Sequence, residues 1–228
     1  VIKVVTNDNG GDALPDDFNL TLEGESVLSE EVVEVFPGTY TAGETMLDEY
    51  SFEGYSGNCN ENGDVTVALG ENKTCTLTND DIPGTLIVNK VTLPADDPTS
   101  FTIELDAEPA EGDAEQTLST DVDVTYSVNA GTYNVTESET DGWNETGNTC
   151  VDVFVDIGQT EYCTITNTKN GHIIIEKDAI NDSDQEFTFQ NDFGKDNDET
   201  FGLVDDETEG LPFFDAEVTP GTYSVSED

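Results

Sequence analysis

Lysine, glutamate and asparagine residues recur in this chain on strand faces that otherwise carry apolar side chains. Strict alternation puts Lys90 on the same face of the segment TLIVNK as Leu86 and Val88. Glu137 shares a face with the Tyr and Val of GTYNVTE, and Asn167 shares one with the Cys and Ile of CTITN. The same alternation turns further residues of these three types inward, namely Lys3, Glu44, Asn79, Lys177 and Glu227.

An amine, a carboxyl group and an amide in one core could form a covalent bond. Burial lowers the pKa of an amine and raises that of a carboxyl group. A neutral lysine amine can then attack the amide carbon of an asparagine, while the carboxylic acid polarises the amide and carries protons. Ammonia leaves, and a Lys–Asn isopeptide bond remains. The alternative is a buried Lys–Glu ion pair with the asparagine as hydrogen-bond partner, and alternation alone does not separate the two.

These residues recur because the whole chain is repetitive. Lys3, Lys90 and Lys177 stand 87 residues apart, in the opening segments VIKVVTND, TLIVNKVTLP and HIIIEKDAIND. Each opening is followed by a GTY signature (GTYTAGE, GTYNVTE, GTYSVSE), and the segments CTLTND and CTITNT close the first two units. We therefore expect three units, residues 1–84, 85–171 and 172–228, the last incomplete at its C-terminal end.

Each unit has the texture of β-structure. Runs such as SFTIELD, VDVTYSV and VDVFVD alternate apolar and polar residues, and turn-rich pieces such as LPADDP and NENGD separate them. The pattern predicts an all-β fold, with tandem Ig-like or prealbumin-like β-sandwich domains in a linear array.

The amino-acid composition argues against several classes of function. The chain carries 52 Asp and Glu against 6 Lys and Arg, a formal net charge of -46. Such a charge repels nucleic acids and anionic membranes, and the longest apolar run is too short to cross a bilayer. A single histidine and the lack of a nucleophile motif or phosphate loop argue against an enzyme.

The four cysteines fall two in each of the first two units. They flank hairpin-like segments, which predicts the disulfides Cys59–Cys75 and Cys150–Cys163 and an oxidising, extracellular compartment. The sequence has no CxxC motif, which argues against a zinc site. We expect no metal or other cofactor, and bound calcium is the weaker alternative. Asn-x-Ser/Thr triplets mark candidate glycosylation sites at Asn19, Asn72, Asn134, Asn144 and Asn181.

The segments HIIIEKDAIND, GTYNVTESETDGW and CTITNT resemble the first strand, the acid-bearing motif and the last strand of Cna-B-type, SpaA-like domains of bacterial pilins and surface adhesins. The resemblance covers all three units. It implies two complete isopeptide constellations, in which Glu44 and Glu137 serve as proton shuttles. It also implies a third pair without its acceptor, in which Glu227 would be the proton shuttle. The three sets are Lys3, Glu44 and Asn79; Lys90, Glu137 and Asn167; and Lys177 with Glu227.

Two functions compete. The first is the structural stalk of a surface adhesin or extracellular filament, whose partners are neighbouring repeats or subunits. The second is an adhesive module that binds a receptor or calcium through acidic loops such as DAINDSDQE and DFGKDNDETFG. Stalk units should resemble one another and a tip domain should differ, so the shared signatures favour the stalk.

The sequence opens and stops within expected strands, which indicates that both ends are cut from a longer protein. The third unit has no closing segment like CTLTND or CTITNT, so Lys177 and Glu227 lack the acceptor Asn that such a segment carries. We expect that the polypeptide continues beyond Asp228; the alternative is completion by a strand from a neighbouring subunit.

Overall fold

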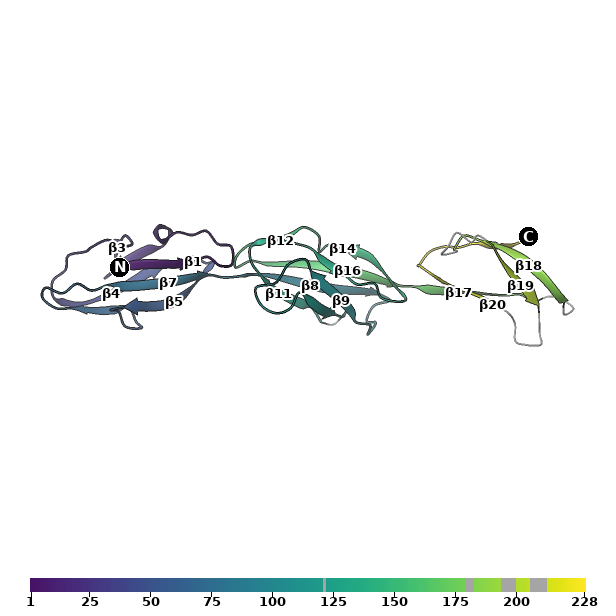
Figure 1. The fold of residues 1–228 in the computed structure, drawn as a ribbon, viewed down its shortest axis with the longest axis horizontal. Coiled ribbons are helices and arrows are strands. Elements are labelled where there is room, and N and C mark those ends of the chain that lie inside the picture. Colours follow the sequence, from purple (N-terminus) through teal and green to yellow (C-terminus); the bar gives the residue numbers. More distant parts are fainter. Residues whose placement is uncertain (121, 179–182, 194–199, 206–212) are drawn as a thin grey trace.

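Three β-rich bodies follow one another along the chain in the computed structural model (Figure 1). The structure describes residues 1–120, 122–178, 183–193, 200–205 and 213–228. Every sheet draws its strands from only one of the three predicted units. The all-β fold class and the linear array are therefore confirmed, while the residue boundaries of the units remain our proposal. We call the three bodies repeat 1, repeat 2 and repeat 3.

Repeat 1 packs two sheets face to face. One sheet has the order β1-β7-β5 and the other β3-β2-β4-β6. The first and last strands, β1 and β7, run parallel and side by side. The elements are β1 (Ile2–Thr6), a 3-10 turn η1 (Pro15–Asp17), β2 (Asn19–Leu22), β3 (Glu25–Val27), β4 (Gly38–Thr45), β5 (Tyr50–Gly57), β6 (Asp64–Val67) and β7 (Cys75–Asp81).

Repeat 2 repeats this plan with longer first and last strands. Its main sheet has the order β11-β8-β16-β14, and it faces the sheet β10-β9-β13 and the pair β12-β15. The first and last strands, β8 and β16, are again parallel neighbours. The strands are β8 (Gly84–Leu93), β9 (Phe101–Leu105), β10 (Glu115–Leu118), β11 (Val124–Val128), β12 (Gly131–Tyr133), β13 (Val135–Glu137), β14 (Trp143–Asn148), β15 (Val153–Val155) and β16 (Thr160–Lys169).

Among the described residues, repeat 3 has strands that correspond to those of the earlier repeats up to the GTY signature. Its first strand, β17, pairs with β20, and a second sheet has the order β19-β18-β21. The strands are β17 (Gly171–Glu176), β18 (Ser183–Asn191), β19 (Thr200–Asp205), β20 (Phe213–Val218) and β21 (Val225–Glu227).

Alternation along the first and last strands builds each core. In β7, and in β8 as far as Thr92, every second residue is buried. Leu86, Val88 and Ile165 are fully enclosed in the core of repeat 2. Because successive strand residues point to opposite faces, the polar residues that fall in this phase are carried into the same core.

The tyrosine of each GTY signature ties its strand to the turn before it. The hydroxyl of Tyr133 donates to the carbonyl of Asn129 at 2.6 Å, and the hydroxyl of Tyr40 donates to the carbonyl of Phe36 at 2.7 Å. Tyr223 makes the corresponding bond to the carbonyl of Thr219. The motif therefore has a structural reason to recur in all three units.

Short joints connect the repeats. Ile82 and Pro83 alone separate β7 from β8, and Gly158 of repeat 2 donates its N–H to the carbonyl of Ile82 at 2.8 Å. The N–H of Ala130 reaches back to the carbonyl of Asn9 at 2.7 Å. Such contacts hold the first two bodies end to end. Among the described residues, no helix is long and apolar enough to span a membrane.

Candidate functional site

The first and last strands of repeat 2 place the lysine and the asparagine in one sheet. In the parallel pair β8 and β16, Lys90 lies opposite Ile165 and Asn167 lies opposite Thr92. Glu137 comes from β13 in the facing sheet. The three side chains therefore meet between the two sheets, in the core and not on a loop.

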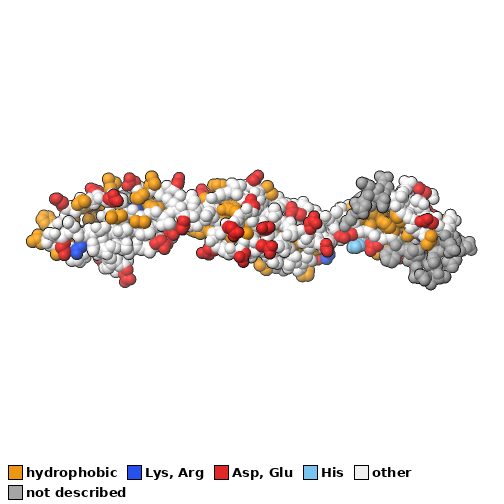
Figure 2. Space-filling model, in the orientation of Figure 1, with side chains coloured by type: hydrophobic (Ala, Val, Ile, Leu, Met, Phe, Trp, Pro, Cys, Tyr) orange, Lys and Arg blue, Asp and Glu red, His pale blue; other side chains and the backbone are white. Residues whose placement is uncertain are grey.

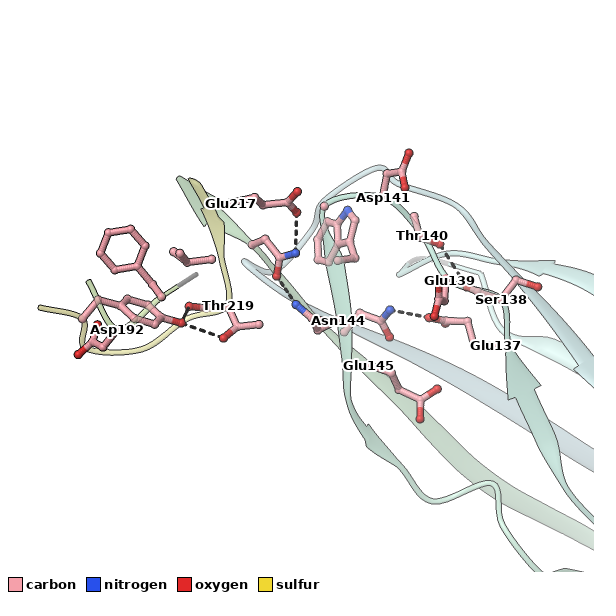
Figure 3. Close-up of a pocket in the computed structure, with 17 residues that line it drawn as sticks. Glu137, Ser138, Glu139, Thr140, Asp141, Asn144, Glu145, Asp192, Glu217 and Thr219 are labelled. Carbon is pink, nitrogen blue, oxygen red and sulfur yellow. Dashed lines mark hydrogen bonds between the residues drawn. The ribbon is translucent and has the colours of Figure 1, made fainter. Parts of the chain in front are cut away.

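Their contacts form a closed triangle. The Lys90 Nζ donates to Glu137 and, at 2.5 Å, to the Asn167 Oδ1. The Asn167 Nδ2 donates to the Glu137 Oε1 at 2.5 Å, the bond drawn beside Glu137 in Figure 3. The side chains of Lys90 and Glu137 are 0% and 3% exposed. The amine thus lies against the amide that it would attack, and the carboxyl group touches both reacting nitrogens.

Repeat 1 brings the same residue types into its core with a different set of contacts. Lys3 Nζ donates to the Glu44 Oε2 at 2.6 Å. The Asn79 Nδ2 lies 3.5 Å from the sulfur of Met46, and Asn79 Oδ1 and Glu44 Oε1 are buried without a hydrogen-bond partner. Buried acceptors left unbonded are unfavourable, so this site is less well satisfied than the triangle of repeat 2.

An aromatic ring lies beneath each of these lysines. The Nζ atoms of Lys3 and Lys90 lie 4.1 and 3.9 Å from the ring centroids of Phe18 and Phe101. Burial lowers the pKa of both amines, and the neighbouring glutamates offset only part of that effect. Each core therefore favours the neutral, nucleophilic form of its lysine more than water does.

These phenylalanines were not predicted from the sequence, although it contains a signal for them. Phe18, Phe101 and Phe187 each open a similar run after the lysine of their unit, FNLTL, FTIEL and FTFQN. A fourth repeated signature could have identified them.

Repeat 3 brings two of its predicted residues together. Lys177 Nζ donates to both carboxylate oxygens of Glu227 at 3.0 Å, and it lies 4.1 Å from the ring centroid of Phe187. The side chains of Lys177 and Glu227 are 16% and 40% exposed. The Lys177–Glu227 pair is therefore more exposed to solvent than the pairs of repeats 1 and 2. That this pair lacks an acceptor asparagine stays a prediction.

The repeat 2 triangle opens onto a hollow. Glu137 and Asn167 line a cavity of about 690 Å³ whose other walls come from residues 138–142, the start of β14, Asn170 and repeat 3. Figure 3 shows Glu139, Asp141, Glu145, Asp192 and Glu217 around it. Glu137 and Asn167, although buried, therefore lie at the edge of this hollow.

The structure joins the cysteines as predicted. Cys59 is bonded to Cys75 and Cys150 to Cys163, with Cα atoms 5.2 and 5.0 Å apart. Each bond fastens the last strand of its unit to a loop before it.

The candidate glycosylation sites differ in their surroundings. Asn19 and Asn72 are exposed. The side-chain nitrogens of Asn134 and Asn144 are engaged by Asp106 and Asn170. Asn181 lies outside the described residues, as do parts of both acidic loops considered for calcium, so glycosylation and calcium binding stay predictions.

Comparison with known proteins identifies the fold family of this chain. The family model described as a prealbumin-like fold domain matches residues 1–77 and 81–172, which is more than half of the chain. This chain therefore belongs to the family of prealbumin-like fold domains, and the predicted resemblance is confirmed. No curated protein matches it.

Several solved structures are similar to it at low identity. The TIE protein of Bacillus anthracis is 17% identical, with 95% of this chain and 44% of that chain covered, at a TM-score of 0.39. A streptococcal ancillary pilin is 16% identical, with coverages of 85% and 66%, at a TM-score of 0.37. Two B repeat units of the collagen binding protein of Staphylococcus aureus are 18% identical, with coverages of 100% and 67%, at a TM-score of 0.26. This chain spans less than half of the first structure and about two thirds of the others.

Proposed function

We propose that this chain is a non-enzymatic extracellular stalk, part of a surface adhesin or filament, that stiffens itself with Lys–Asn isopeptide bonds. The observation that carries the proposal is the buried triangle of Lys90, Glu137 and Asn167 between the first and last strands of repeat 2. The disulfides, which suit an oxidising compartment, and the end-to-end repeats support it. The partners we propose are neighbouring repeats or subunits of the same kind.

The reaction balances within the triangle. The neutral Lys90 amine attacks the amide carbon of Asn167, and Glu137 donates a proton to the developing tetrahedral species. The bond between the amide carbon and Nδ2 breaks, and ammonia leaves after Glu137 has moved the amine proton to it. No oxidant or cofactor takes part, and the burial of the amine supplies the nucleophile.

The position of the proposed bond suits it to resist a pulling force. A bond between Lys90 and Asn167 joins β8 to β16, the two strands through which a pulling force enters and leaves the repeat. Force then passes through covalent bonds, and the rest of the unit stays folded. Repeat 1 has the same parallel arrangement of β1 and β7, with Lys3, Glu44 and Asn79 in the corresponding roles.

Intact mass spectrometry of the denatured full chain tests the proposal. We expect a loss of two ammonia molecules for the two complete repeats, besides four hydrogens for the two disulfides. The variant Glu137→Gln should keep the ammonia of Asn167, whereas the matched variant Glu139→Gln, changed on the wall of the cavity, should still lose it. A full-length mass with no ammonia lost would overturn the isopeptide proposal and leave a stalk held by buried ion pairs.

A further inference from the structure

Thr92 is a buried polar residue to which the proposed reaction gives no part. It stands two residues after Lys90 in β8, on the same face of the strand, and it is 2% exposed. Its hydroxyl has no hydrogen-bond partner among the described residues. Most buried hydroxyls are hydrogen-bonded, and one that is not destabilises the fold. Because a valine would fill the same space without that penalty, we expect the hydroxyl to act outside the resting state of the site.

The register of the sheet places Thr92 beside the amide that would react. In the parallel pair of β8 and β16, Thr92 lies directly opposite Asn167. Neighbouring strands of a sheet are about 4.8 Å apart, and successive residues of a strand point to opposite faces. Both side chains are buried on the core face, so the hydroxyl and the amide are neighbours in one core.

The oxygen of the Asn167 amide would lose its donor as the bond forms. In the resting site this oxygen accepts a hydrogen bond from Lys90, and Glu137 contacts the two nitrogens. Attack by the amine moves the electrons of the carbonyl bond onto the oxygen, and the amine nitrogen becomes bonded to the amide carbon. From that position the nitrogen can no longer donate to the oxygen. The oxyanion therefore needs a different donor.

Solvent is poorly placed to supply this donor. Asn167 is only 2% exposed, so water has little access to its amide. Figure 2 shows acidic side chains spread over the surface of repeats 1 and 2, and an ionised carboxylate accepts hydrogen bonds without donating any. A hydroxyl that is already fixed in the core needs no reorganisation when the charge develops, and such preorganised donors stabilise an oxyanion best. Thr92 supplies a hydroxyl of this kind.

We propose that the Thr92 hydroxyl donates a hydrogen bond to the oxyanion that forms on Asn167, and that it thereby speeds the cross-link of repeat 2. The inference rests on the proposed isopeptide reaction and adds a residue to it. The hydroxyl keeps its proton throughout. The bond between Lys90 and the amide carbon forms, the bond from that carbon to Nδ2 breaks, and ammonia leaves with the proton that Glu137 carries.

Repeat 1 has no hydroxyl at the corresponding position. Val5 stands two residues after Lys3 and lies opposite Asn79 in the parallel pair of β1 and β7. The Oδ1 atom of Asn79 is buried, and the described part of the chain offers it no hydrogen-bond donor. The two repeats thus differ by an isopropyl group in place of a hydroxyl-bearing side chain beside the amide. We expect repeat 1 to form its cross-link more slowly than repeat 2.

The rate of cross-linking in the full chain tests this inference. The chain is made by cell-free synthesis under oxidising conditions, and samples are quenched in acid over time. Mass spectrometry of a protease digest then measures the branched peptide that joins Lys90 to Asn167. We expect Thr92→Val to form this peptide at least about tenfold more slowly than the parent, and Thr92→Ser, which keeps the hydroxyl, to react at close to the parent rate. The fluorescence of Trp143, which is buried in repeat 2, checks that each variant folds.

The possible outcomes separate this inference from the cross-link itself. Equal rates in the parent and in Thr92→Val would overturn the role of Thr92 and leave the isopeptide proposal intact. Equal slowing by Thr92→Ser and Thr92→Val would also overturn it, because the effect would then come from packing. In repeat 1, Val5→Thr should speed the appearance of the peptide that joins Lys3 to Asn79, and an unchanged rate would contradict the role of the hydroxyl. A parent chain that yields neither branched peptide would overturn the proposed cross-link, and this inference with it.

Discussion

Replacing Lys90 with Met and Glu137 with Gln in one chain removes the proposed bond from repeat 2 without leaving a charge in its core. Both changes nearly conserve volume, and exchanging a buried ion pair for neutral residues is often close to neutral for stability. The difference in unfolding free energy between this variant and the parent should therefore report mainly the covalent link.

The magnitude follows from the length of the loop that the bond would close. Lys90 and Asn167 are 77 residues apart. Closing a loop of that length restricts the unfolded chain by about 4.5 kcal/mol at 25 °C. For a unit of this size that corresponds to a fall of roughly 20–30 °C in the midpoint of thermal unfolding.

The single tryptophan of the chain makes the assay specific. Trp143 is buried in repeat 2, edge-on to Phe101, so its fluorescence follows the unfolding of that repeat alone. The matched control replaces Lys3 with Met and Glu44 with Gln, and it should leave the Trp143 transition unchanged. A shift of less than about 5 °C in the repeat 2 variant, or an equal shift in the control, would contradict a covalent link between Lys90 and Asn167.

The other predictions use the same fluorescence readout. Tyr133→Phe removes the hydrogen bond to the carbonyl of Asn129 and should lower the stability of repeat 2 by about 1–2 kcal/mol; an unchanged midpoint would contradict it. Replacing Cys150 and Cys163 by Ala opens a loop of 13 residues. In the chain that already lacks the isopeptide bond, this should remove about 3 kcal/mol, and free thiols in the denatured, unreduced parent would contradict the pairing. In Asn167→Ala the amine of Lys90 stays free, with a pKa that burial holds below 10.5. The unfolded state then binds more protons than the folded state between that lowered pKa and 10.5, so stability should rise with pH across this window; a flat profile would refute the burial effect.

Much of this protein follows from its sequence because strands impose a period of two. Once the repeat had aligned Lys90 with Lys3 and Lys177, alternation alone put these lysines on apolar faces, and the first two are buried in the structure. The two disulfide pairings could be predicted because each unit has only two cysteines. The all-β fold class followed from the same alternation and from the turn-rich pieces between the runs.

The tertiary structure decided which of the inward-facing residues touch. In repeat 2 the facing sheet brings Glu137 onto both Lys90 and Asn167, whereas in repeat 1 the Asn79 amide turns to Met46. No local pattern encodes this difference, because it depends on how side chains from two sheets pack around one another.

The absence of a strand at residues 31–35 of repeat 1 was also not predictable from the sequence. The run EEVVEVF has the composition of a strand, yet residues 31–35 form none. A strand exists only when a neighbouring backbone satisfies its N–H and C=O groups, and the presence of that neighbour is settled by the assembled fold and not by the residues of the strand itself.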